Sequence, residues 1–223
     1  VQGKILGFDY TSSFSDTVLF RIDRSPYELA AYLKTKVPLG DSFIIEPGIR
    51  FNTYSDQKNN FFPELRLGLK YLINDDRYIN FAVGNYHQFI QTAQDDFNPS
   101  IIDFWIAIDK SVEAGASQQI VLGYEEYIDS RYKIQIEGYY KNIQNTLTFV
   151  DSRSSTDEIL ENSSVGDNFL MSDGYAYGLE LFTQKLTGKF TGWISYTYSI
   201  SRKSIEESYF FNNWDRRHAF SLI

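Results

Sequence analysis

The sequence contains no cysteine among its 223 residues and only two histidines, His87 and His218. The lack of cysteine excludes a disulfide scaffold, a thiolate metal site and a cysteine nucleophile. The net charge is −8, and no block of five like charges occurs anywhere. A nucleic-acid partner is therefore not expected.

Long hydrophobic runs are also missing. The stretch IIDFWIAI at 101–108 is interrupted by charge well before the roughly 20 apolar residues that a transmembrane helix needs. Helical periodicity is almost absent along the whole chain. Around Val1 there is neither a signal-peptide pattern nor an initiating methionine, and we expect both ends to be cut from a longer chain.

Alternation of apolar and polar residues runs through most of the sequence, together with a high aromatic content of 17%. In RYKIQIEGYYK at 131–141, one face is apolar and the other carries two lysines and a glutamate. The segments 45–52, 63–71 and 174–199 alternate in the same way. A period of two is the pattern of β-strands with one polar and one apolar face.

This alternation predicts an all-β chain of about ten strands. The expected strands are 3–12, 27–37, 42–54, 61–72, 78–90, 117–127, 131–149, 172–186, 189–201 and 214–223. Many exceed the usual five or six residues of globular strands. Crossing a bilayer at a tilt takes roughly 9–11 residues, so these lengths favour a membrane.

The connections alternate strictly between short turns and long polar loops. The short turns are 38–41, 74–77, 128–131 and 186–189. The long loops are 13–26, 55–60, 91–116, 150–171 and 202–213. All turns then lie at one end of the sheet and all loops at the other, as in an up-and-down outer-membrane barrel. This parity holds only if DFWIAID at 103–109 is a ribbon outside the membrane.

In a transmembrane antiparallel β-barrel the apolar face meets lipid and the charged face lines the lumen. We expect tyrosines near the strand ends to form interfacial girdles, among them Tyr71, Tyr78, Tyr124, Tyr127 and Tyr132. The expected lumen-facing charges have both signs: Glu46, Arg50, Glu64, Arg66, Lys70, Lys133, Glu137 and Glu180.

Exposed aromatics in the 91–116 loop are candidate ligand contacts, because no core demands them there. They are Phe97, Phe104 and Trp105, and packing within the loop is the alternative. His87 and His218 are either ligands of a metal or substrate or ordinary wall residues, and we favour the second reading. The acidic loop at 151–168 lacks the pattern of an EF-hand. We expect no metal site and no cofactor.

No nucleophile motif such as Gly-x-Ser-x-Gly occurs, and nothing singles out the Ser–His pair of an outer-membrane phospholipase. We therefore expect a protein that is not an enzyme.

Several segments, taken in order, resemble successive barrel strands of TonB-dependent outer-membrane receptors, and they are most similar to members from Bacteroidota. They are FPELRLGLKYLI, INFAVGNYHQFIQ, SQQIVLGYE, IEGYYKNIQNTL, DGYAYGLELF, GKFTGWISYTYS and NNWDRRHAFSLI. The resemblance covers residues 1–223 and implies part of a 22-stranded barrel. The family's plug domain and TonB box have no counterpart in this sequence, so we expect a fragment.

The resemblance implies a receptor that binds a scarce nutrient, most often a ferric siderophore, and imports it with energy delivered by the TonB complex. The resemblance also implies that the protein lies in the bacterial cell outer membrane and contacts outer-membrane lipid. It further implies that the lumen charges seat the plug, and that Asp215, Arg216 and Arg217 form an ion-pair motif in the wall. The alternatives are a passive porin-like channel and a secreted all-β polysaccharide-binding module.

Overall fold

The computed structural model describes residues 2–5, 8–14, 17–95, 104–149, 164–205, 208–212 and 215–223. The long strands are β6 (Phe43–Tyr54), β7 (Phe61–Asn74), β8 (Arg77–Gln88), β11 (Gly115–Ile128), β12 (Tyr132–Phe149), β13 (Phe169–Lys185) and β14 (Gly192–Ile205). The shorter ones are β1 (Gln2–Ile5), β2 (Phe8–Phe14), β3 (Thr17–Arg24), β4 (Tyr27–Lys34), β5 (Val37–Leu39), β9 (Ile90–Asp95), β10 (Phe104–Ala107), β15 (Ser208–Phe211) and β16 (His218–Leu222). One helical turn, α1 (Val165–Asn168), precedes β13.

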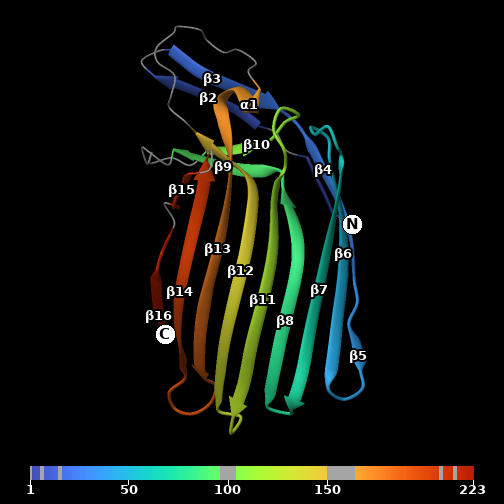
Figure 1. Ribbon diagram of the computed structural model, residues 1–223, viewed down its shortest axis with the longest axis vertical. Coiled ribbons are helices and arrows are strands. Elements are labelled where there is room, and N and C mark those ends of the chain that lie inside the picture. Colours follow the sequence, from blue (N-terminus) through green and yellow to red (C-terminus); the bar gives the residue numbers. More distant parts are fainter. Residues whose placement is uncertain are drawn as a thin grey trace.

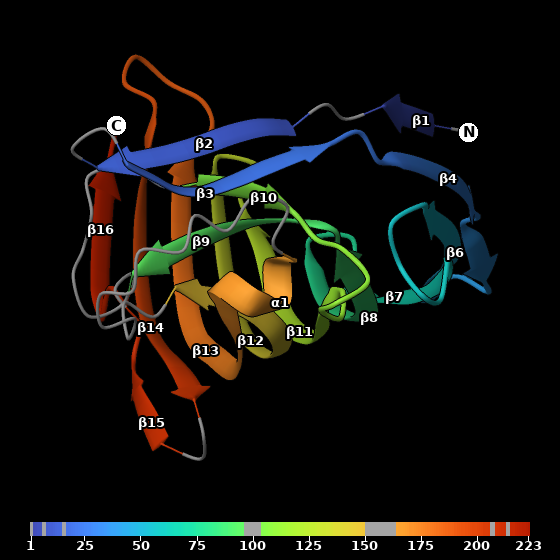
Figure 2. The ribbon, with the colours of Figure 1, turned by 90° about the horizontal axis from the view of Figure 1, so that it is seen from above.

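The wall of the molecule is one antiparallel sheet in which strands adjacent in sequence are also adjacent in space. Its order is β1-β4-β6-β7-β8-β11-β12-β13-β14, and β16 pairs with the lower part of β14. Figure 1 shows all the tight turns at one end of these strands and the longer connections at the other. The predicted all-β, antiparallel up-and-down architecture is thereby confirmed. Seen from above, the wall is an open arc (Figure 2).

The N-terminal prediction was wrong in detail. The expected strand 3–12 is divided between β1, which pairs with β4, and β2, which pairs with β3 in a separate two-stranded sheet. The expected loop 13–26 therefore contains most of a hairpin. Val18, Phe20 and Ile22 alternate through β3, and this pattern supports a strand as well as any wall segment does.

Other boundaries moved by a few residues. The expected strand 27–37 consists of β4 and β5, which pair with β6 in one continuous register. Gly40, with φ of 62°, makes the turn that follows. The loop at 202–213 carries the end of β14 and its partner β15, and β16 begins only at His218.

The 91–116 excursion contains a ribbon, as expected. β9 and β10 pair antiparallel, and the end of β9 also runs parallel to the end of β12. Figure 2 shows the ribbon and α1 on the concave side of the arc. Across the described residues, no helix is long and apolar enough to cross a membrane.

The two faces of the wall differ in chemistry. Arg50 lies opposite Glu64, and Glu137 lies opposite Glu180, so the charged residues share one face. Tyr54 belongs to that face of β6, and its hydroxyl donates to the carbonyl of Ile108, next to β10 on the concave side. The charged face is therefore the concave one.

The convex face is apolar above the Arg77–Glu126 ion pair near the turns, and no other described element covers it. Leu65, Leu122 and Leu179 are 60%, 59% and 52% exposed. Two tyrosines of the expected girdle do not belong to this face. Tyr78 and Tyr127 lie on the concave side, because Tyr78 is the cross-strand partner of Glu125 and Tyr127 that of Lys133.

Candidate functional site

A small apolar core closes over the loop end of the concave face. We call residues 104–114 together with 164–169 the cap. Side chains of the cap and of the strands' loop ends form one buried cluster. The cap contributes Ile106, Ile108, Val112, Ala114, Val165 and Phe169, and the wall contributes Tyr54, Phe89 and Leu147. The Tyr54 and Phe89 rings stack with their centroids 4.7 Å apart. The cap is a packed structure of its own, held to the wall.

Hydrogen bonds from the 55–60 loop fix the cap's backbone. The side-chain amide of Gln57 donates to the carbonyls of Asp109 at 2.6 Å and Val112 at 3.0 Å. The N–H of Ile108 donates to the carbonyl of Phe89 at 3.0 Å. These bonds satisfy buried backbone groups of a segment that has no regular partner strand after Ala107.

The carboxylate of Asp109 joins the two halves of the cap. Its oxygens accept from the N–H of Ser111 at 2.9 Å and from the N–H of Val165 at 3.0 Å, and the Ser111 hydroxyl donates to it as well. Asp109 is only 2% exposed. A buried carboxylate requires such partners, because water is not available to solvate it.

A bulge in β12 lies beside the cap. The pairing of β12 with β13 shifts between Ile143 and Thr146, and Asn145 has φ of 58°. Asparagine tolerates this left-handed conformation better than most residues. The carbonyl of Asn145 accepts from the amide of Gln91 at 3.0 Å, and Gln91 in turn accepts from the N–H of Leu147.

Below the cap, the concave face forms a hollow of about 510 Å³, which we call the sub-cap hollow. Side chains or backbone of the loop-side halves of β8, β11 and β12 line it, with Gln91 at its upper edge. Its polar groups are Tyr86, His87, Gln88, Gln91, Ser117, Gln119, Lys141, Gln144 and Thr146. Polar residues thus make up most of the lining of this hollow.

The charges predicted to line the lumen all lie on the concave face, and most of them are paired there. Glu46 contacts Lys34 at 2.7 Å, and Arg50 contacts Glu28 at 3.5 Å. Near the turn end, Glu125 lies 3.0 Å from Lys133 and 3.9 Å from Lys70. Within the described chain, Glu137 and Glu180 have no cationic partner and face each other across β12 and β13.

Glu64 and His87 come together where β7 and β8 separate. Regular pairing of these strands ends at Arg66 and Gly84. Above that point the Glu64 carboxylate accepts from the N–H of His87 at 2.8 Å and from Arg66 at 2.8 Å. On the other face the Asn85 side chain bonds to the N–H of Leu65 and the carbonyl of Pro63. These side chains replace the missing backbone ladder.

The two histidines have separate surroundings. The ring of His87 packs against Phe62, its Nδ1 atom is buried without a hydrogen-bond partner, and it lies 3.8 Å from Glu64. Nδ1 of His218 is 2.7 Å from the Tyr196 hydroxyl on the convex face. Among the described residues, no three His, Asp or Glu side chains converge as metal ligands do.

The structure describes only some of the aromatic residues that we predicted as ligand contacts in the 91–116 loop. Phe97 lies outside the described residues. Phe104 starts β10, but only its backbone is described. Trp105 is 61% exposed, while the next residues, Ile106 to Ile108, are buried in the cap. The segment that follows Trp105 thus contributes to a core, while the proposed ligand contacts stay a prediction.

In the described part of the WDRRH segment, Asp215 and Arg217 form an ion pair, and Arg216 takes no part in it. Nε of Arg217 lies 2.6 Å from the carboxylate of Asp215, which also accepts from the N–H of Ser201 at 2.7 Å. Burial opposes ionisation of Asp215, but these two hydrogen bonds outweigh it and lower the pKa of that carboxyl. Arg216 is exposed, and its carbonyl accepts from the Ser199 hydroxyl.

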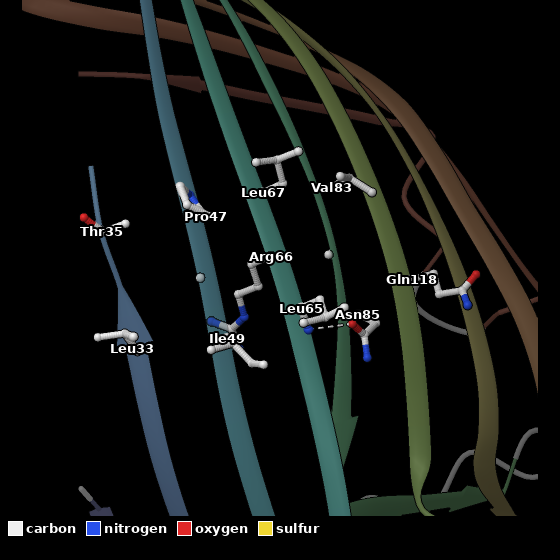
Figure 3. A pocket seen from close by; sticks show the side chains of 12 residues that line it. Leu33, Thr35, Pro47, Ile49, Leu65, Arg66, Leu67, Val83, Asn85 and Gln118 are labelled. Carbon is white, nitrogen blue, oxygen red and sulfur yellow. Dashed lines mark hydrogen bonds between the residues drawn. The ribbon is translucent and has the colours of Figure 1, made fainter. Parts of the chain in front are cut away.

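A second hollow, of about 720 Å³, opens on the apolar face between β4 and β11 (Figure 3). Half of its lining residues are Leu33, Pro47, Ile49, Leu65, Leu67 and Val83. The dashed line in Figure 3 marks the bond from the N–H of Leu65 to Asn85. The hollow offers apolar contacts and no cluster of reactive groups.

Sequence reasoning missed Asp109, Gln57 and Gln91, which hold the cap, and it did not single out Lys141. The first three lie outside the alternating segments and find their partners more than 50 residues away. In the sequence these residues are marked only by their position beside an apolar run, as Asp109 is in WIAID at 105–109.

No protein-family model matches the sequence, and no curated protein matches it. Among solved structures, the chain resembles that of the FpvAI–pyocin S2 complex, with a TM-score of 0.66 and 15% identity over 93% of this chain. It also resembles the siderophore receptor PirA from Pseudomonas aeruginosa, with a TM-score of 0.59 and 13% identity over 86% of this chain. The alcaligin outer-membrane receptor FauA from Bordetella pertussis gives 0.59 and 16% over 90%.

The chain spans only 27%, 40% and 34% of these three structures, respectively. At such low identity the likeness concerns the fold alone. The fold of this chain matches part of an outer-membrane β-barrel receptor, as PirA and FauA are described.

Proposed function

We propose that the chain is the wall of an outer-membrane receptor that binds a scarce nutrient outside the cell and imports it with TonB-delivered energy. One observation carries the proposal: an up-and-down wall of long strands, apolar on its convex face, matches an outer-membrane receptor fold over 93% of its length. The sequence resemblance to TonB-dependent receptors adds the energy source and the nutrient class, a ferric siderophore.

The exposed convex face supports the membrane part of the proposal. Leu65 and Leu122 are mid-strand residues that keep more than half of their surface open. An apolar band of this size in water favours aggregation, whereas lipid tails satisfy it. A secreted polysaccharide-binding module needs strands nearer six residues and a covered apolar face, and the strands here run to 18 residues in β12.

The concave face is suited to seating a plug domain. Its paired charges near the turn end, around Glu125, line the lower lumen, and the unpaired Glu137 and Glu180 are available to basic groups of a plug. In this proposal Phe97, Phe104 and Trp105 contact the ligand from the external loop. Asp215 and Arg217 stabilise the external end of β14.

The proposal is tested by expressing the full gene product in Gram-negative cells and separating their membranes. We expect it in the outer membrane, with a band on gels whose mobility shifts only after boiling. Recovery in the soluble fraction without detergent contradicts the proposal and favours the binding module.

Energy coupling is tested by uptake of iron complexes in iron-starved cells with and without TonB. Uptake that needs TonB supports the receptor. A heat-modifiable protein that conducts ions in planar bilayers and transports solutes equally without TonB is a passive channel instead.

A further inference from the structure

Within the described part of the chain, Lys141 differs from six other cations of the concave face in its lack of a carboxylate partner. Lys34, Lys36, Arg50, Arg66, Lys70 and Lys133 each have a carboxylate within 4.0 Å. Lys141 has no such partner among the residues that the structure describes. Its charge is thus left without a counter-ion from the wall.

The neighbours of Lys141 keep its ammonium group open to the interior. Across β13 its partner is Ala176, and the adjacent residues of that face of the strand are Gly174 and Gly178. Across β11 its partner is Gln119. The Tyr139 side chain lies over Gly178, and the small residues Gly174 and Ala176 leave the room for a ligand beside the amine.

The sub-cap hollow around Lys141 carries hydrogen-bond donors and no carboxylate in its described lining. The Ser117 hydroxyl accepts from the amide of Gln119 at 3.2 Å, so its own proton is free to donate. Gln144 is exposed at the rim. A lone ammonium surrounded by amides and hydroxyls is suited to oxygen atoms that bear negative charge.

The aromatic surface of the hollow is less suited to sugar stacking. The guanidinium of Arg66 lies 4.5 Å from the centre of the Tyr86 ring and covers that face. The charge of Arg66 is balanced by Glu64 at 2.8 Å, so Lys141 remains the unpaired cation of the described lining. The nearby Glu64 side chain is 4% exposed and is already paired with Arg66, so the described lining offers a cationic ligand no free carboxylate. A neutral sugar finds the Tyr86 ring already occupied on one face.

We infer that the sub-cap hollow binds an anionic, oxygen-rich ligand such as a carboxylate-bearing metal complex, with Lys141 as its charged contact. This inference rests on the import function proposed above and adds the charge class of the ligand. Hydrogen bonds from a charged donor are about twice as strong as neutral ones, so Lys141 is the contact whose loss matters most.

The test measures binding by calorimetry to the full gene product, purified in detergent from outer membranes. Ferric citrate is the anionic probe, and ferrioxamine B, a cationic iron complex, is the comparison. Lys141→Gln is expected to weaken ferric citrate binding about tenfold or more. Lys141→Arg keeps the charge and is expected to retain most of the affinity. Lys189→Gln, in a turn at the far end of the wall, is the matched control.

Binding of ferric citrate must also weaken as salt is raised, because salt screens the ammonium charge. The inference is overturned if Lys141→Gln binds ferric citrate as the parent does, or if ferrioxamine B binds more tightly. It is also overturned if neither probe binds at about 1 mM. A protein that stays in the outer membrane in these cases retains its proposed function, whereas a soluble one loses both.

Discussion

The carboxylate of Asp109 accepts a hydrogen bond from the N–H of Val165 at 3.0 Å, across 56 residues of sequence. Asp109→Ala removes a buried acceptor and leaves the N–H groups of Ser111 and Val165 unpaired. Each such loss costs about 1–3 kcal/mol. We expect faster hydrogen exchange and proteolysis in the cap, while the wall keeps its heat-modifiable mobility. Lys110→Ala, at the exposed neighbouring position, is the control, and equal protection in both variants would contradict this role.

Leu122 tests the orientation of the wall. It lies in the middle of β11 and faces outward, so Leu122→Arg would place a charge near the bilayer midplane at a cost of about 2–4 kcal/mol. Urea unfolding in lipid vesicles measures this loss. The matched variant Thr197→Arg puts the same group on the concave face, opposite Glu180, and we expect little destabilisation. Equal losses would mean that the two faces are wrongly assigned.

Gly178 is required by a close approach between strands. A Cβ atom there would lie 2.6 Å from the carbonyl oxygen of Tyr198 and 2.8 Å from the hydroxyl of Tyr139. We expect Gly178→Ala to lower the free energy of unfolding by about 1–3 kcal/mol. At Gly138, on the neighbouring strand, the nearest atom is 3.9 Å away. Gly138→Ala should therefore be tolerated in the same unfolding assay.

The ion pair of Asp215 and Arg217 predicts a pH dependence. The pKa of Asp215 is lowered from its ordinary value of 3.8, so its stabilising contribution is complete above that value. The contribution is lost as the pH falls through the lowered pKa. We expect the stability advantage of the parent over Asp215→Asn to be present at neutral pH and to shrink in acid. An advantage that persists unchanged at about pH 2 would refute this assignment.

Much of the wall was predictable because its chemistry is local. In β7, Leu65, Leu67 and Leu69 alternate with Glu64, Arg66 and Lys70, and a one-residue slip would expose charge to lipid. The hairpin of β2 and β3 was missed because alternation does not say which sheet a strand joins. Its residues pair with one another outside the wall.

The site was less predictable, since its key groups depend on contacts between distant segments. The polar character of Lys141 was visible in the 131–141 pattern, but its lack of a carboxylate partner follows from Gln119 and Ala176 on neighbouring strands. Asp109 reads in sequence as a charge at the end of an apolar run. Only the folded cap shows that this charge is buried.

The bulge at Asn145 shifts the inside–outside alternation of the β12 side chains by one residue. Below it Ile143 lies opposite Gly174, and above it Thr146 lies opposite Ser172, so odd positions exchange places with even ones. Deleting this extra residue would close the bulge and leave Thr146 opposite Ser172 and Leu147 opposite Met171 in one regular ladder. The alternation of side chains above the bulge is therefore set separately from the alternation below it. A loop segment above the bulge can be exchanged without a change in the register of the wall beneath it.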